Sequence, residues 1–398
     1  MFESPTVFPA FRFITMNSRV TMAAVAKQGG VHTTTVSLAL RNHPSLPEAT
    51  RKRLQQLAEQ MGYRRDPALS ALVAYRRQTR PIKSNPLLAY ITHWDSRFGW
   101  KELPAHRAFF EGATRKAADL GYQLEHFWLG EPGLTHPRMS RILYSRGIVG
   151  LIIASHRTEK TAPLDFEWSK FSAVKIDFAP RDQLLHIITN NQRVIISQAV
   201  QRVKAAGYRR IGFVMPYWWD EFVELAWSAG FLAEQQKMPE ADRIPILYYS
   251  TPDLPEASAD LHGPLYVVPP ATLSTWMATH RPEVIVSFGY FVLDSLKALG
   301  LSVPRDVAFV ETFLEKPDGH HAGIRQNCHR VGELAVEILA GQLHQHVYGM
   351  PSIPTMTLVE GIWFEGASLP PRPRSAGDSA PPPRAPKRKP ALKARVSH

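Results

Sequence analysis

From residue 87 onward, short apolar runs alternate with segments whose apolar residues recur every three or four positions. The runs LLAYITHW, IVGLIIAS and EVIVSFG are typical of buried strands, whereas AFFEGATRKAADLGY and VGELAVEILAGQL are typical of amphipathic helices. A chain that alternates in this way forms parallel sheets with right-handed crossovers. Because there are too many units for one doubly wound sheet, we expect an α/β body of two lobes.

The expected domains follow from this alternation and from composition. Residues 1–18 show no periodicity, and residues 366–398 are rich in Pro, Arg and Lys, so we expect a disordered leader and a disordered tail. The segments between them are a headpiece (19–65), a hinge with its linker (66–85), an N-lobe (about 86–190 and 326–350) and a C-lobe (about 191–325 and 355–365).

The net charge of +12 is concentrated in two flanks of the chain. Residues 17–80 hold eleven Lys and Arg against three acids, a balance of +8, and residues 366–398 hold eight against one, a balance of +7. The long middle is slightly acidic. Such asymmetry indicates a polyanionic partner, most often nucleic acid, although charge kept for solubility would also explain the tail.

Cysteine content and hydropathy indicate the cellular compartment in which the protein functions. The single cysteine, Cys328, excludes an internal disulfide framework and is typical of a reducing cytoplasm. No stretch reaches the roughly 18 apolar residues of a membrane helix. The first residues lack the order of a secretory signal. We therefore expect a cytoplasmic protein.

Residues 22–62 predict three short helices. QGGV interrupts the first two, Pro47 suits the start of the third, and Gly62 suits its end. This arrangement predicts a helix-turn-helix, whose second helix lies in the DNA major groove. That helix would begin at HTTT, residues 32–35. A threonine hydroxyl can bond a phosphate or a base edge, and its methyl group can contact thymine.

The same stretch resembles the DNA-binding headpiece of the LacI/GalR repressor family. The resemblance rests on VTMAAVAKQGGVHTTTVSLALRN, ATRKRL, GYRRDP and ALSAL, which follow one another nearly without gaps. It implies that Thr33 and Thr34 read bases, and that a hinge leucine, here Leu72, enters the minor groove. The complete set of expected DNA-binding residues is Thr21, His32, Thr33, Thr34, Thr35, Ser37, Leu38, Arg41, Thr50 and Leu72.

Three residues depart from the family pattern. His32 replaces a serine that would be a better N-cap, Leu38 replaces an arginine that reads guanine, and Gly29 replaces an alanine. We therefore expect an operator that differs from those of arginine-bearing relatives. Leu38 as a packing residue, and the whole motif as a degenerate remnant, are the alternatives.

The body resembles the family's effector domain, which is similar to periplasmic sugar-binding proteins. RGIVGLII, AAGYRRIGFV and GIRQNCHRVGELAVEIL carry this resemblance. It implies a small ligand, such as a sugar, bound between the lobes at the carboxyl ends of the strands. The side chains expected to bind it are Trp94, Asp95, Arg97, Trp100, Ser155, His156, Trp219, Asp220, Trp227, Phe288, Tyr290 and Glu311. Each aromatic residue could instead pack inside its lobe or at a dimer face.

Two positions of this expected pocket also depart from the family. Trp227 stands where the family commonly has an arginine, and Glu311-Thr312-Phe313 stands where it has Phe-Asp-Asp. Either the ligand class has changed or the effector has been lost.

An enzyme is the main alternative class. His320, His321, Cys328 and His329 lie close together, but they lack metal-binding spacing, and the chain has no P-loop or GxGxxG motif after a strand. We expect no catalytic residues, no metal and no cofactor. The predicted protein is a homodimeric transcriptional repressor that binds near-palindromic DNA and a small effector. Its alternatives are a DNA-binding regulator without effector, and a small-molecule-binding module with a vestigial headpiece.

Overall fold

The structure is a computed structural model that describes residues 20–40, 46–63, 85–156, 163–181, 183–249 and 267–372. Arg41, Leu72 with the predicted hinge helix, the leader 1–18 and the tail from residue 373 lie outside the described residues. Contacts divide the chain after Asn191, before Asn327 and after Glu360. The headpiece (20–63), the first lobe (85–191 and 327–360) and the second lobe (192–326 and 361–372) are described in turn.

The headpiece contains α1 (Met22–Gly29), α2 (Thr33–Leu40) and α3 (Glu48–Gln60). Its core consists of one buried residue cluster from all three helices, Val25, Ala26, Val36 and Ala58, against which Val31 and Leu40 pack. Gly30, at φ 64°, ends α1 in the left-handed conformation that glycine adopts without strain. Its N–H bonds carbonyls of α1, so the chain turns directly into α2.

The first lobe is a parallel six-stranded sheet with the order β11-β5-β4-β3-β1-β2. Its elements are β1 (Leu87–His93), η1 (Gly99–Glu102), α5 (Pro104–Asp119), β2 (Gln123–Trp128), α6 (His136–Ser145), β3 (Gly150–His156), η2 (Trp168–Lys170), β4 (Ser172–Ile176), β5 (His186–Asn190), α12 (Cys328–Gln345) and β11 (Met356–Val359). Strands β3 and β4 are buried along their whole length, as expected for a sheet covered on both faces. The expected parallel α/β architecture is confirmed.

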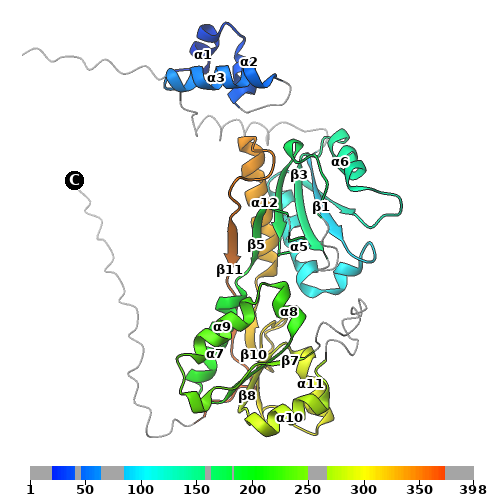
Figure 1. Ribbon diagram of the computed structural model, residues 1–398, viewed down its shortest axis with the longest axis vertical. Coiled ribbons are helices and arrows are strands. Elements are labelled where there is room, and N and C mark those ends of the chain that lie inside the picture. The colour runs from blue at the N-terminus through cyan, green and yellow to red at the C-terminus, as the bar shows by residue number, and fades with distance from the viewer. Residues whose placement is uncertain are drawn as a thin grey trace, which may run out of the picture. The chain divides into compact units, whose positions relative to one another are not determined.

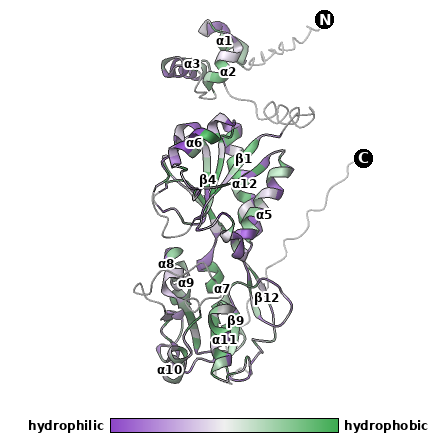
Figure 2. Ribbon diagram, turned by 90° about the vertical axis from the view of Figure 1, so that its right-hand side faces the viewer, coloured by the Kyte–Doolittle hydropathy of each residue, from purple (hydrophilic) through white to green (hydrophobic). Residues whose placement is uncertain are grey.

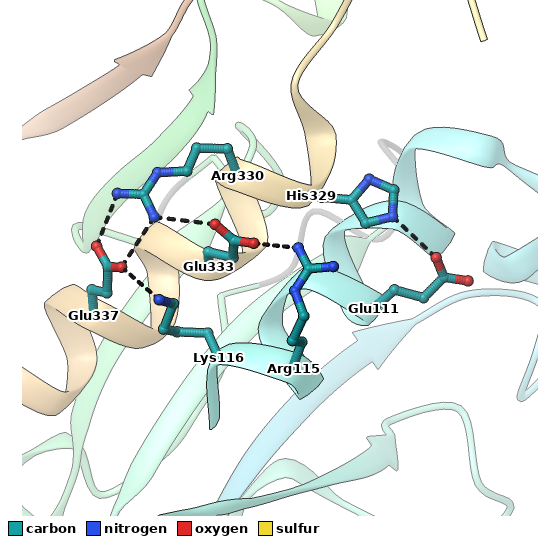
Figure 3. A network of polar contacts seen from close by, with 7 residues as sticks. All are labelled: Glu111, Arg115, Lys116, His329, Arg330, Glu333 and Glu337. Carbon is teal, nitrogen blue, oxygen red and sulfur yellow. Dashed lines mark hydrogen bonds and ion pairs between the residues drawn. The ribbon is translucent and has the colours of Figure 1, made fainter. Parts of the chain in front are cut away.

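Helices α5 and α12 lie side by side in the first lobe (Figure 1). They cross at two glycines, because a Cβ at Gly112 would overlap the carbonyl of His329 and one at Gly332 would overlap that of Phe109. Around this crossing, acidic and basic side chains of the two helices alternate (Figure 3). The pairs are His329–Glu111 (3.1 Å), Lys116–Glu337 (3.2 Å), Arg330–Glu333 (3.1 Å), Arg330–Glu337 (3.0 Å) and Arg115–Glu333. Exposed ion pairs contribute little each, so close backbone packing is the main link between the helices.

The second lobe is a six-stranded sheet with the order β12-β10-β9-β8-β6-β7. Its elements are α7 (Gln192–Ala205), β6 (Ile211–Pro216), α8 (Tyr217–Phe222), α9 (Ala226–Gln235), η3 (Glu240–Asp242), β7 (Leu247–Tyr249), α10 (Pro270–His280), β8 (Val284–Ser287), α11 (Gly289–Ala298), β9 (Ala308–Glu311), β10 (Ala322–Arg325) and β12 (Ile362–Phe364). All pairings are parallel except that of β12 with β10. Hydrophobic colour concentrates on the strands, whereas α3 of the headpiece is largely hydrophilic (Figure 2).

The chain's return to the second lobe differs from expectation. Residues 355–360 were expected in the C-lobe, but β11 pairs in parallel with β5 and extends the first sheet. The amide of Ile187 donates to the carbonyl of Thr355, and that of Asn191 donates to the carbonyl of Val359. The return therefore begins at Gly361.

The expectation of disorder from residue 366 is wrong for residues 366–372. The Ser368 hydroxyl donates to the carbonyl of Phe309 (2.7 Å) and accepts from the amide of Ala322 (2.9 Å). Leu369 is buried, and Arg372 pairs with Glu283 (2.6 Å). Composition alone missed this segment because a few anchoring contacts order it despite its prolines. Within the described residues, none of the helices has the length and hydropathy needed to cross a membrane.

Candidate functional site

The amino end of α2 is closed by a histidine side chain. The amide of Thr34 donates to Nδ1 of His32 (3.3 Å), and the Thr34 hydroxyl lies 2.7 Å from the same nitrogen. The His32 carbonyl accepts from the amides of Thr35 and Val36. His32 therefore caps α2, because an unprotonated ring nitrogen can accept from a helix amide as a serine oxygen does; that it is a poorer cap than serine stays a prediction.

The expected DNA-binding residues of α2 lie along one side of the helix. Thr34 is exposed, while Thr33, Thr35, Ser37 and Leu38 are partly exposed. The buried residues of this helix are Val36 and Ala39, so the core holds the opposite side. Leu38 does not belong to the headpiece core cluster, and it remains a predicted DNA contact.

Two further expected DNA-binding threonines lie at helix starts. Thr21 is the N-cap of α1, and its hydroxyl accepts from the amide of Ala24 (3.3 Å). Thr50 lies in the first turn of α3 and is partly exposed. Gly29 lies against α3, where a Cβ would meet Leu54 Cδ2 at 2.9 Å. This departure from the family pattern thus lets α1 and α3 pack closely.

A comparison with protein-family models identifies this headpiece. Residues 21–66 match the model described as bacterial regulatory proteins of the lacI family. The headpiece is a lacI-family helix-turn-helix domain. The match covers α1, α2 and α3, which are the helices that place the threonines.

Solved lacI-family structures share the fold over most of the chain. A complex of the transcriptional regulator CelR with cellobiose is 17% identical, with a TM-score of 0.52 over 88% of this chain and 100% of its own. A Lac repressor dimer bound to operator and the anti-inducer ONPF is 16% identical, with a TM-score of 0.50 over 89% and 100%. A putative lacI-family regulator from Rhizobium etli is 17% identical, with a TM-score of 0.53 over 71% and 99%. No curated protein matches the chain in sequence.

The expected ligand residues of the first lobe after β1 differ in exposure. Asp95 and Arg97 are exposed, and Trp94 is partly buried with its ring 5.5 Å from that of His106. Trp100 is fully buried, packs against Tyr90 (5.8 Å between ring centres) and donates from Nε1 to the carbonyl of Arg97 (3.2 Å). The environment of Trp100 is that of a core residue, as its alternative interpretation held.

Ser155 and His156, at the end of β3, are buried polar residues. Ser155 adopts φ 53°, which is unusual for a residue other than glycine, and its Oγ lies 2.8 Å from Nδ1 of His106. Nδ1 of His156 bonds the carbonyl of Ala154 (3.0 Å), while its Nε2 is buried without a hydrogen-bond partner. Burial lowers the pKa of His156 to about 3 and that of His106 to about 4, so both rings are neutral at pH 7.

One polar residue of this edge was missed by sequence reasoning. Asp177 follows β4 at φ 62°, and its carboxylate accepts from the Thr189 hydroxyl (2.6 Å). Desolvation raises its pKa to about 6. The signal was present, because an acidic residue directly follows the apolar run of β4.

In the second lobe, the expected carboxylates are helix caps. Asp220 accepts from the amides of Trp227 (3.1 Å) and Ser228 (3.2 Å) and from the Tyr248 hydroxyl (2.6 Å). Glu311 accepts from the amide of Gly289 (2.7 Å) at the start of α11. Burial raises the pKa of Glu311 to about 7.

The aromatic residues expected in the second lobe gather around Phe288. Trp219 lies 5.2 Å and Trp227 5.7 Å from its ring centre, and Phe313 stacks on it at 5.8 Å. Trp227 and Phe288 are buried, whereas Trp219 and Phe313 are partly exposed. Tyr290 lies in α11, with its side chain outside the described part. The buried rings have the environment of core residues, and Trp219 and Phe313 form the accessible rim of the cluster.

The histidines and cysteine considered for catalysis do not form a metal site. Across the part of the chain that the structure describes, no three His, Cys, Asp or Glu side chains are placed to hold a metal ion. Cys328 is buried and accepts from the amide group of Asn190 (3.4 Å), and burial raises its thiol pKa to about 12. A thiol in this environment is protonated and unreactive at pH 7.

Proposed function

We propose that the chain is a sequence-specific DNA-binding transcriptional repressor whose affinity for its operator is modulated by a small ligand. The observation that carries this proposal is the lacI-family headpiece, whose α2 presents threonine hydroxyls on the side opposite its core. The basic balance of the surrounding residues supports phosphate binding. Function in the cytoplasm, where bacterial DNA lies, is part of the proposal.

The partners proposed are a near-palindromic operator and a second copy of the chain. The Lac repressor structure of the same fold is a dimer bound to operator, which supports this arrangement. Two headpieces related by a two-fold axis would each occupy one half-site. The expected DNA contacts are those on α2 together with Thr21, His32, Arg41, Thr50 and Leu72.

The ligand class proposed is a sugar or a related metabolite. The support is the cellobiose bound by CelR, a protein of the same fold. In this chain the polar groups at the carboxyl ends of β3 and β4 are buried, and Ser155 and Asp177 adopt a left-handed backbone conformation. Strained polar residues concentrate at binding sites. Trp219 and Asp95 are among the candidate contacts, and we propose no catalytic activity.

Selection from a random DNA library tests the DNA-binding part of this proposal. The full chain should enrich duplexes with two inverted half-sites, and binding should weaken steeply with salt because phosphate contacts release counterions. A vestigial headpiece would enrich no sequence. The midpoint of thermal unfolding, measured with individual sugars present, then distinguishes the two kinds of regulator. A sugar that binds should raise the midpoint, whereas no sugar raises it for a regulator without effector.

A further inference from the structure

The contact between His32 and Thr34 constrains the hydrogen positions on both side chains. His32 Nδ1 lies 3.3 Å from the backbone nitrogen of Thr34 and 2.7 Å from its hydroxyl oxygen. A backbone amide can only donate, so the nitrogen that faces it must be an acceptor. The imidazole hydrogen is therefore on Nε2.

The same reasoning fixes the direction of the Thr34 hydroxyl. A separation of 2.7 Å between Nδ1 and Oγ1 requires one hydrogen between them. Since Nδ1 carries none, the hydroxyl hydrogen of Thr34 points at His32. The lone pairs of Oγ1 are then the only hydrogen-bonding capacity that Thr34 can offer to a partner outside the protein.

We infer that His32 makes Thr34 an acceptor at the DNA base edge, so that this position selects a base with an exocyclic amine in the major groove. Adenine N6 and cytosine N4 are the donors of that groove, whereas guanine O6 and N7 and thymine O4 are acceptors. The inference rests on the proposed function, in which α2 lies in the major groove. It assigns His32 a positioning role that adds to any contact of its own with DNA.

The selectivity follows from the hydrogen bond between the Thr34 hydroxyl and His32, which would be lost if Thr34 donated to a base. To face guanine or thymine favourably, the Thr34 hydroxyl must turn its hydrogen toward the base and leave Nδ1. The net value of one such bond corresponds to a preference of roughly 3- to 10-fold at that base pair. Other base pairs of the half-site are unaffected, because they do not contact Oγ1.

A double-mutant cycle on a selected operator tests this inference with the full-length protein. Thr34→Val keeps the side-chain shape without the hydroxyl, and the base pair whose preference it changes is the one that Thr34 reads. His32→Gly removes the imidazole, and glycine is tolerated at an N-cap at a cost of only a few tenths of a kcal/mol relative to the best caps. Binding to four operators that differ only at that base pair is compared within each protein, so a loss of overall affinity cancels.

The expected result is a preference for adenine or cytosine of roughly 5-fold in the unmodified protein, falling below about 2-fold in His32→Gly. In the Thr34→Val background, His32→Gly should leave the base preference unchanged. An unchanged preference in His32→Gly, or no base pair that depends on Thr34, overturns the inference while the proposed function stands. Failure to select any sequence overturns both.

Discussion

At the residue scale, helix capping explains several side chains that the sequence presented as ligand groups. Asp220 lies in α8, four residues after the end of β6, and Glu311 is the last residue of β9. At such positions a ligand contact and a helix cap both require an acceptor. The structure places backbone amides on both carboxylates. Sequence could locate these residues correctly but not separate the two roles, because the distinction depends on how each loop turns.

Burial of Glu311 predicts a pH-dependent stability. Its pKa is raised from 4.5 to about 7, so the folded state holds this proton more tightly than the unfolded state does. The contribution to stability is complete below pH 4.5 and is lost as pH rises through about 7. Glu311→Gln cannot titrate, so its stability should not fall as pH rises from 4.5 to about 7. The difference in unfolding free energy, variant minus parent, should therefore rise by up to about 3 kcal/mol over this pH range.

Urea unfolding of parent and variant at several pH values measures this difference. Asp177, whose pKa is also raised, is present in both proteins, so its effect cancels in the comparison. Parallel stability curves for the two proteins would show that Glu311 does not titrate in this range.

At the element scale, the strands and helices that the sequence located best are those with long, clear periodicity. β5 is short and ends in polar residues, although Ile188, Thr189 and Asn190 are buried in the sheet. β11 was misplaced because its edge position leaves Met356 and Leu358 exposed. The residue sequence of neither segment indicates which of its residues are buried. The position of each strand is determined by its pairing with strands that are distant in the sequence.

The crossing of α5 and α12 gives a prediction with an internal control. Gly112→Ala and Gly332→Ala place a Cβ against backbone that cannot move alone, so each should destabilise the protein by about 1–3 kcal/mol or more. Gly341→Ala, also in α12, meets no atom within 4 Å and should stabilise by roughly 0.5–1 kcal/mol.

Chemical denaturation of the three variants checks the sign of each change. Equal effects for Gly332→Ala and Gly341→Ala would mean that the helices separate easily, contrary to the close crossing described here.

At the scale of the whole molecule, the sequence located the helices of the headpiece, whereas the ligand residues stay a prediction. The headpiece motif lies within one continuous stretch, so its spacing is visible in the sequence. The ligand residues come from many strand ends, and whether Trp100 or Trp227 is exposed depends on packing that no local pattern records. The two lobes were expected, but the return of the chain to the second lobe at Gly361 was not.

The anchored segment 366–372 predicts where the chain can be shortened. Truncation after Arg372 removes seven basic residues and one acidic residue and keeps the described contacts of residues 366–372 with the second lobe, so we expect an unchanged thermal stability. Truncation after Glu365 also removes buried Leu369 and the two hydrogen bonds of Ser368. It should cost about 3–5 kcal/mol.

Calorimetric unfolding of both truncated chains distinguishes the two cases. Equal midpoints would contradict the packing of residues 366–372 against the second lobe. The chain ending at Arg372 should also bind DNA with a smaller salt slope if the removed bases contact phosphate.

The most direct test of sequence-specific DNA binding through α2 is the ratio of specific to non-specific affinity at one moderate salt concentration. The protein is compared with its double variant Thr33→Ala, Thr34→Ala on the selected operator and on a scrambled duplex. Loss of two base contacts should lower operator affinity roughly 100-fold while non-specific affinity stays unchanged. A double variant that keeps the ratio of the unmodified protein would contradict the assignment of α2 as the base-reading helix.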